Sequence, residues 1–529
     1  MKNNNSRSGF FGGALSLTIS ALIVKILGLV YKIPLMNVLG SEGMGYFNSA
    51  YSVYVFFLMV CSAGVPKAVS IMITGNEVKE GGRNSVRIFR VCAVCITALG
   101  CILAAVMFFG AGAISSAIGN RGARECMLAI APSLVFVAIS GVIRGYLNGV
   151  SSFSEIALSG VIDGGLRLLF GLSFATIGYR HGRVLSDCAA LSVLGITLSS
   201  LLSSMYLIIV IKIKLAKEKK RQSVYAEIPG HRIVRNMAKI ALPITVSSAV
   251  MSISNIIDLG LIMRRLQSAG CSESAATSLY GNYTTLVVPM FNLVATAVTP
   301  VCMALLPSMT AAYAGGETNK LRSSLAGAIR IVSFLCAPIT VAFMLFPREI
   351  LSLIFDDGEA AVAAPMLALI APAVLFMGMM SVVNTYLEAA GSYRAPLIAM
   401  TCGAALKLAA GYVLIGNENI GIIGAPVGTV ICYAVGLIVS LVYLVRRGGS
   451  AMVAFRMWAP LAVSAVALPL GAVIRDRVFR MPDSGAGTFV LILSCAILYL
   501  VFSFALGIVS VSNLKKMANS TKVTSHNYQ

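Results

Sequence analysis

The residues of this 529-residue chain best suited to chemistry are charged side chains that fall inside long apolar runs. Such a side chain is costly at the centre of a bilayer unless it is paired or solvated. The basic ones are Lys25, Arg144, Arg167 and Lys407. If these four face one cavity, the cavity is cationic and favours an anionic head group such as a pyrophosphate. Lys67 is a further candidate at the rim, although a lysine at a helix end that reaches water explains it equally well.

Acidic and amide side chains inside the apolar runs are candidates for coupling transport to a cation. Asp258 lies late in one run with Asn255 about one turn before it, and Glu388 ends another run. Asp163 precedes Arg167 by four residues, so the two share one face of a helix and can pair. For all of these acids, a salt bridge or hydrogen bond that only fixes helix packing remains an alternative.

The sequence lacks the patterns that would indicate an enzyme. The three histidines are placed in loops or in the tail, and there is no phosphate-binding loop of the GxxxxGK[ST] type. Cys92-Ala-Val-Cys95 lies in an apolar run without a second pair that would complete a zinc site. We therefore expect no catalytic residues, no metal and no cofactor.

The elements that must position these residues are membrane-spanning helices. The chain is 58% hydrophobic and 12% charged, whereas soluble domains carry about 25% charged residues. Residues 91–112 and 360–383 contain no charge, and each run reaches the roughly 20 residues needed to cross the hydrocarbon core. The first run continues past Lys25, so we interpret it as a retained helix and not as a signal peptide. The predicted fold class is an all-α polytopic membrane protein.

Hydropathy predicts about fourteen transmembrane helices, with a possible break of the second at Gly64-Val65-Pro66. They cover residues 10–35, 45–74, 88–112, 126–147, 154–178, 186–211, 237–262, 278–306, 324–346, 362–388, 395–415, 422–445, 457–474 and 488–510.

Basic residues set the predicted orientation. The net charge is +21, and most Lys and Arg residues fall on the side of the N-terminus, including a cluster at 212–239. Because basic residues collect in cytoplasmic loops, we expect both termini in the cytoplasm and no nucleic-acid partner. A role of the basic cluster in binding anionic lipid or a partner is the alternative to topology alone.

An internal duplication is a further expectation. Residues 144–171 match 384–411 in a Tyr-Leu pair, a Ser-aromatic pair and a buried cation, so that Arg167 corresponds to Lys407. The predicted domains are an N-lobe (1–211), a basic cytoplasmic linker (212–236), a C-lobe (237–445), and two last helices with a cytoplasmic tail (446–529).

Several segments resemble a known family. Residues 24–35, 39–51, 260–270, 279–282 and 384–391 are similar to stage V sporulation protein B and related Gram-positive polysaccharide exporters. That family belongs to the multidrug/oligosaccharidyl-lipid/polysaccharide (MOP) superfamily, which includes the MurJ-type lipid II flippases. The resemblance extends from about residue 10 to residue 510.

The resemblance implies two six-helix lobes of a MATE-like fold around a central cavity, with two additional helices. It also implies flipping of an undecaprenyl-pyrophosphate-linked sugar to the outer leaflet, with Lys25 at the family's basic position two residues before Leu27-Gly28. Gram-negative MurJ-type proteins carry further Arg and Asp residues in the first two helices. This chain has Tyr31 and Lys32 there, and Ser52 where relatives often have proline, which leaves the cargo open.

We therefore expect a monomeric flippase of the bacterial cytoplasmic membrane that moves a lipid-linked oligosaccharide by alternating access. Its expected partners are this substrate, membrane lipids and a coupling ion, Na⁺ or H⁺; the membrane potential is the other possible energy source. The cargo we expect is a peptidoglycan precursor. A cation-coupled multidrug antiporter, a non-transporting protein of envelope or spore assembly, and a sugar-transferring membrane enzyme are the alternatives.

Overall fold

The structure of the chain is a computed structural model that describes residues 3–80, 84–219, 228–447, 458–476 and 485–506. The described parts of all fourteen predicted segments fall mainly on helices, and the described residues form no strand; residues 457 and 507–510 of the last two segments lie outside the described residues. Within the described ranges, ten helices are long and apolar enough to cross a membrane, or eleven if one bent pair counts as a single span, and Trp458–Ile474 is a shorter apolar helix. The expected all-α polytopic fold is therefore confirmed.

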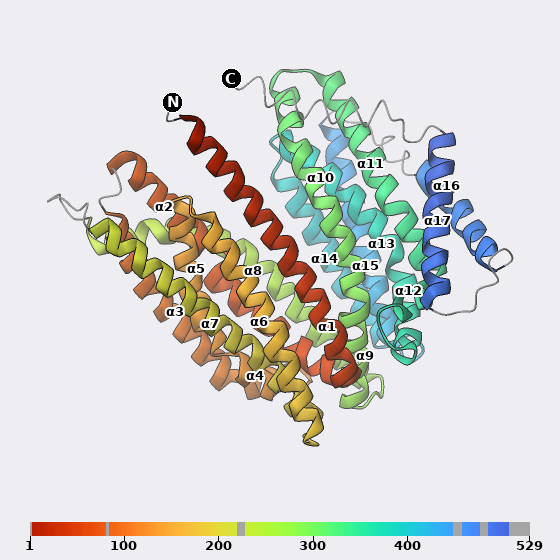
Figure 1. The fold of residues 1–529 in the computed structure, drawn as a ribbon. Helices are drawn as coiled ribbons and strands as arrows, with labels where there is room; N and C mark the ends of the chain where they lie inside the picture. Colours follow the sequence, from red (N-terminus) through yellow and green to blue (C-terminus); the bar gives the residue numbers. More distant parts are fainter. Residues whose placement is uncertain (1–2, 81–83, 220–227, 448–457, 477–484, 507–529) are drawn as a thin grey trace. The chain divides into compact units, whose positions relative to one another are not determined.

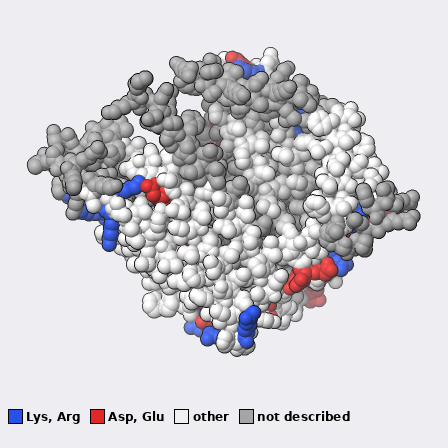
Figure 2. Space-filling model, viewed as in Figure 1, with Lys and Arg blue, Asp and Glu red and all other residues white. Residues whose placement is uncertain are grey.

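Charged side chains are sparse among the described residues on the face seen in Figure 2. Figure 2 shows a wide area without Lys, Arg, Asp or Glu. A surface of this kind is compatible with lipid and would be unusual for a soluble domain.

The chain divides into two compact units, Met1–Thr285 and Leu286–Gln529. The helices of the first unit are α1 (Asn3–Ser62), α2 (Val65–Glu80), α3 (Ser85–Ile118), α4 (Ala123–Ile130), α5 (Ser133–Gly149), α6 (Phe153–Arg180), α7 (Leu185–Lys219), α8 (Gly230–Ser268) and α9 (Glu273–Asn282). A π-helical turn, η1 (Tyr283–Val287), follows α9. Because α8 and α9 pack on α1, the first unit extends beyond the predicted N-lobe. The six-helix repeat stays a prediction.

Two kinds of break shape the helices of the first unit. α1 is kinked at Gly40, whose φ of 62° suits a residue without a Cβ atom. The predicted break before Pro66 is confirmed, since α1 ends at Ser62 and α2 begins at Val65. The predicted fourth span is divided into α4 and α5, which are bent by 40° next to Pro132. Proline lacks the N–H that would continue the helix.

Glycines allow a close helix contact between α6 and α7 in the first unit. A Cβ atom on Gly195 of α7 would lie only 2.4 Å from the backbone nitrogen of Gly171 on α6. Side chains larger than hydrogen would force the two helices apart. α6 and α7 are therefore a tightly packed pair, and α1 packs on α6 (Figure 1).

The second unit is built around α13, the most buried of the spanning helices. Its helices are α10 (Val288–Ala314), α11 (Thr318–Leu345), α12 (Pro347–Ser352), α13 (Asp357–Ala389), α14 (Arg394–Ile415), α15 (Gly424–Arg446), α16 (Trp458–Ile474) and α17 (Gly485–Ala505), with a 3₁₀ turn, η2 (Gly421–Ile423). α10, α11 and α15 pack on α13, and α16 and α17 form a pair that joins the unit chiefly through α11.

Candidate functional site

Four polar residues follow one face of α6 at intervals of four: Glu155, Ser159, Asp163 and Arg167. We call this set the α6 ladder. Residues four apart stack one above the other on a helix, so the ladder is a continuous polar stripe. It begins near the predicted cytoplasmic end of α6 and reaches the middle of a helix that is otherwise apolar.

The part of the ladder nearest the middle of α6 is an ion pair. The Nη2 atom of Arg167 donates to Oδ2 of Asp163 at 2.8 Å, and the hydroxyl of Ser199 on α7 donates to Oδ1 at 3.0 Å. The pair predicted from the four-residue spacing is thus confirmed. The side chains of Arg167 and Asp163 are 28% and 21% exposed, and Nε of Arg167 has no hydrogen-bond partner among the described residues.

A second guanidinium joins the ladder from α5. Nε of Arg144 donates to the hydroxyl of Ser159 at 3.2 Å, and Ser203 on α7 donates to the backbone carbonyl of Ser159 at 3.0 Å. Arg144 is close enough to Asp163 and Arg167 to interact electrostatically with both. Two cations therefore share one carboxylate in this region, which leaves it with excess positive charge.

The end of the ladder at the start of α6 carries no net charge. Nζ of Lys214 on α7 lies 2.8 Å from Oε1 of Glu155 and also donates to the hydroxyl of Ser152. This pair lies where α6 begins and α7 approaches its end. It fixes the two helices at that level, so the excess positive charge is confined to the region of Arg144.

Aromatic side chains of α1 lie beside the part of the ladder that contains Arg167. Phe47 and Tyr51 stack with ring centroids 6.0 Å apart, and Tyr54 follows at 5.8 Å from Tyr51. The hydroxyl of Tyr31 is 2.6 Å from that of Ser192 on α7. The three tyrosines are near enough to Arg167 for electrostatic interaction. Tyr31, Phe47 and Tyr54 are buried, whereas Tyr51 is half-buried.

The structure brings together only some of the predicted substrate-binding residues. Arg144 and Arg167 lie close to each other. Lys67 is exposed on α2, and Lys407 is half-buried on α14 of the second unit. The side chain of Lys25 lies outside the described residues, although its backbone belongs to α1. The cavity lined by four cations therefore stays a prediction.

The predicted coupling residues are distributed over both units. Asp258 is half-buried and Asn255 is exposed on α8 of the first unit. Glu388 is half-buried near the end of α13 in the second unit. An ion-coupling role remains a prediction for each of them.

A close contact between α1 and α9 was not apparent from the sequence. A Cβ atom on Gly281 would lie 1.9 Å from the backbone oxygen of Ser41, and one on Gly45 would lie 2.2 Å from that of Thr277. We call this contact, with its polar partners, the α1–α9 seam. Those partners are the hydroxyls of Ser41 and Ser278 and, at 2.8 Å, the amide of Asn48 with the hydroxyl of Thr285.

A similar contact joins α8 to the end of α3. Arg264 donates to the backbone carbonyls of Ala117 at 2.6 Å and Ser116 at 3.2 Å, and Gln267 donates to that of Gly119. The last carbonyls of a helix have no partner within it and carry partial negative charge, so an arginine stabilises them. By the predicted topology, this contact and the α1–α9 seam lie on the external side.

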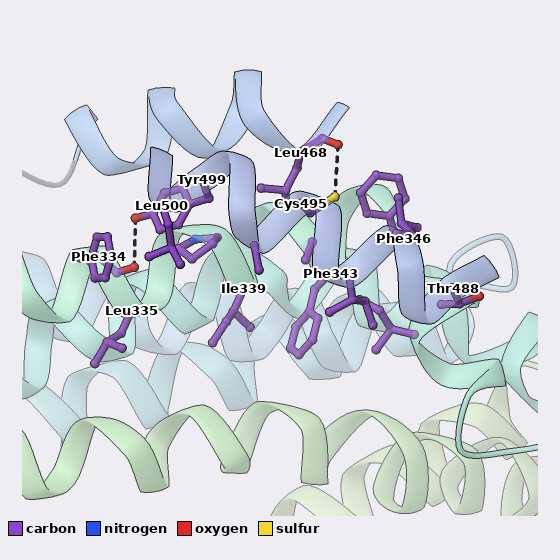
Figure 3. A pocket seen from close by; sticks show the side chains of 16 residues that line it. Phe334, Leu335, Ile339, Phe343, Phe346, Leu468, Thr488, Cys495, Tyr499 and Leu500 are labelled. Carbon is purple, nitrogen blue, oxygen red and sulfur yellow. Dashed lines mark hydrogen bonds between the residues drawn. The ribbon is translucent and has the colours of Figure 1, made fainter. Parts of the chain in front are cut away.

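The second unit contains an apolar groove between α11 and the α16–α17 pair (Figure 3). Its volume is about 450 Å³, and Phe334, Ile339, Phe343, Leu468 and Tyr499 are among the residues that line it. The hydroxyl of Tyr499 donates to the backbone carbonyl of Phe334 at 3.0 Å. A long apolar chain is the kind of ligand that fits such a groove.

Sequence reasoning missed the serines of α7 that support the ladder. Ser192, Ser199 and Ser203 recur at intervals of seven and four, which places them on one helix face. A polar stripe at that spacing in an apolar run was the available signal. The tyrosines of α1 carried no comparable signal, because their neighbours are more than a hundred residues away along the chain.

Comparisons with known proteins agree with this architecture. The family model described as polysaccharide biosynthesis protein matches residues 10–313, and the MatE family model matches residues 243–413. Stage V sporulation protein B of Bacillus subtilis is 22% identical over 426 residues, which are 80% of this chain and 81% of that protein.

Two solved structures show the same fold. The lipid II flippase MurJ in an inward closed conformation has a TM-score of 0.69 at 15% identity, covering 93% of this chain and 98% of that one. A multidrug resistance MATE family transporter of the MOP superfamily in an inward-facing conformation has a TM-score of 0.65 at 17% identity, covering 82% and 98%. The predicted MATE-like fold is thereby confirmed.

Proposed function

Because the chain belongs to the polysaccharide biosynthesis protein family, we propose that it flips an undecaprenyl-pyrophosphate-linked saccharide across the bacterial cytoplasmic membrane. Lipid II or a related cell-wall precursor is the cargo we favour, since a relative of the same fold is a lipid II flippase. The protein acts as a transporter by alternating access and not as an enzyme.

The observation that carries the proposal is the excess positive charge at Arg144. This guanidinium is contributed by α5 to a polar stripe inside a membrane-spanning helix bundle, and the partner it contacts there is the neutral hydroxyl of Ser159. Ionisable groups in membranes face protein or water-filled cavities and not lipid. A pyrophosphate entering from the cytoplasmic side would supply the missing negative charge. Lys25, Lys407 and Lys67 remain candidates to share it, whereas Arg167 is already paired with Asp163.

The apolar groove beside α16 and α17 supports a lipid-linked cargo. A prenyl chain must stay in an apolar environment while its head group crosses, and the groove lined by Phe343 and Leu468 provides one. A soluble sugar or a free nucleotide would have no use for it.

The α1–α9 seam supports alternating access. In the predicted topology it closes the external side, and it joins the start of the second predicted helix to the start of the eighth. Opening of the seam would release the head group outward. The half-buried carboxylate of Asp258 on α8 is the coupling site that we propose, with Asn255 beside it and Glu388 as a second candidate.

The match of residues 243–413 to the MatE family favours one alternative, a cation-coupled multidrug antiporter. An antiporter for cationic drugs would need an acidic or apolar binding site. The excess positive charge around Arg144 and Arg167 argues against it.

Reconstitution into vesicles tests the proposal. Labelled undecaprenyl-pyrophosphate disaccharide is added to one leaflet, and its appearance in the other leaflet is measured for the wild type, Arg144→Gln and Arg90→Gln. Arg90 is an exposed arginine on α3 and serves as the matched control. A charge-assisted hydrogen bond contributes about 1.5–3 kcal/mol, so Arg144→Gln should weaken binding of the labelled lipid by about 10- to 100-fold. Absence of flipping by the wild type, together with drug-driven proton or sodium flux, would favour the antiporter.

A further inference from the structure

The α6 ladder offers two positions of different chemistry. At Ser159 the neighbouring group is the cation Arg144, which contacts a neutral hydroxyl. About one and two turns further along α6, Asp163 and Arg167 form an ion pair at 2.8 Å. The first position attracts an anion. The second carries no net charge and presents both a hydrogen-bond acceptor and hydrogen-bond donors.

An ion pair of this kind is a poor site for a phosphate. The carboxylate of Asp163 already neutralises Arg167 and would repel a second anion. A sugar hydroxyl, in contrast, can donate to a carboxylate and accept from a guanidinium at the same time. Neutral ligands with adjacent hydroxyl groups therefore match the pair better than anions do.

The pair is not completely satisfied by the protein. The side chains of Arg167 and Asp163 retain 28% and 21% of their exposure near the middle of a membrane-spanning helix. Nε of Arg167 has no hydrogen-bond partner among the described residues. A buried donor without a partner is costly, and charged groups at this depth do not face lipid. The atoms of the pair that keep this exposure, which do not include the buried Nε, are thus available to a polar ligand.

An aromatic surface lies beside the same pair. Tyr51 on α1 is half-buried, is stacked on the buried ring of Phe47 and is within electrostatic range of Arg167. The face of an aromatic ring is electron-rich and attracts the weakly positive C–H groups of a pyranose ring. The phenol hydroxyl adds a further donor and acceptor.

We propose that Tyr51, Asp163 and Arg167 form a subsite for the first sugar ring of the lipid-linked saccharide. The inference rests on the proposed function and adds a site of sugar recognition to it. Ser159 and Arg167 are eight residues apart on one helix, so the anion position and the sugar subsite are separated by about 12 Å. That span accommodates a pyrophosphate followed by a sugar ring. The phosphate would lie nearer the predicted cytoplasmic end of α6, and the sugar would lie deeper.

The inference predicts that the two positions can be separated by choice of ligand. Wild-type protein and its variants in vesicles are titrated with undecaprenyl-pyrophosphate disaccharide and, separately, with sugar-free undecaprenyl pyrophosphate. The measured quantity is the ratio of the two affinities. The variants are Tyr51→Leu, Tyr51→Phe and the double variant Asp163→Asn, Arg167→Gln. Phe109→Leu, which alters an exposed ring on α3, is the matched control.

We expect Tyr51→Leu and the double variant to weaken binding of the saccharide-bearing lipid by about fivefold or more, or about 1 kcal/mol. Binding of the sugar-free lipid should weaken by less than about twofold. Tyr51→Phe should retain most of the affinity because it keeps the ring. Arg144→Gln should weaken both ligands. Equal losses for both ligands, or no loss for either, would overturn the subsite. Failure of the wild type to bind either lipid would instead refute the proposed function. Thermal unfolding of each variant separates a lost contact from a misfolded protein.

Discussion

The α1–α9 seam makes a sharp prediction for Gly281→Ala. A Cβ atom at this position would lie 1.9 Å from the backbone oxygen of Ser41, whereas ordinary contacts begin at 3.4 Å. The two helices must therefore separate by about 1.5 Å, since a backbone oxygen cannot rotate away. Overpacking of this kind costs about 1–3 kcal/mol.

The cost applies only to the conformation in which the seam is closed. Alanine also favours helix over glycine by up to about 1 kcal/mol, but α9 is helical whether the seam is open or closed, so this gain cancels. The equilibrium should therefore move toward the open seam by about 5- to 150-fold. The hydrogen bond between Asn48 and Thr285 should be lost more often as well.

Hydrogen–deuterium exchange measures this shift at the backbone amides of α9 and of α1 beyond its kink. In Gly281→Ala these amides should exchange faster than in the wild type, while α6 and α7 should be unchanged. Gly260→Ala on α8 is the matched control, because no atom lies within 4 Å of its added Cβ. The reasoning is refuted if these amides exchange in Gly281→Ala at the same rate as in the wild type and the unfolding temperature is unchanged. It would mean that the seam tolerates the extra methyl group.

Three further predictions concern single contacts. Arg264→Gln should speed exchange at the end of α3 by about tenfold, because two charge-assisted bonds to backbone carbonyls are lost, and wild-type rates there would contradict this role. Asp163→Asn should lower the free energy of unfolding by about 1–3 kcal/mol, because it leaves Arg167 without its counter-charge. Removing both charges should be less harmful than Asp163→Asn alone, and the reverse order in a melting experiment would refute the pairing argument. Tyr499→Phe should lower the free energy of unfolding by about 1 kcal/mol, because the hydrogen bond to the carbonyl of Phe334 is lost. An unchanged melting temperature would show that this hydrogen bond does not stabilise the protein.

The fold was predictable because the membrane imposes a simple rule on the sequence. Each spanning helix needs about 20 apolar residues, and that requirement is visible without any tertiary information. The break at Gly64-Val65-Pro66 could be predicted for a similarly local reason. The bend at Pro132 could not, because a proline inside an apolar run is compatible with either a kinked span or a divided one.

The candidate site was predictable only where its contacts are local. Asp163 and Arg167 are four residues apart on one helix, so their pairing followed from helix geometry. The contribution of Tyr51 depends on α1 packing against α6, more than a hundred residues later in the chain. No local pattern encodes such a neighbour. The α1–α9 seam was missed for the same reason.

The α6–α7 contact and the α1–α9 seam differ in how they are held. α6 and α7 are joined by the pairs of Lys214 with Glu155 and of Ser199 with Asp163, in addition to glycine packing. The α1–α9 seam combines glycine packing with hydrogen bonds between neutral side chains. A hydrogen bond to a charged group contributes about 1.5–3 kcal/mol, whereas a neutral hydrogen bond contributes only about 0.5–1.5 kcal/mol. The seam is therefore the cheaper contact to open, so α6 and α7 should move as one body while α1 and α9 separate. A transport cycle built on this structure would keep the ligand-binding ladder intact and move the seam.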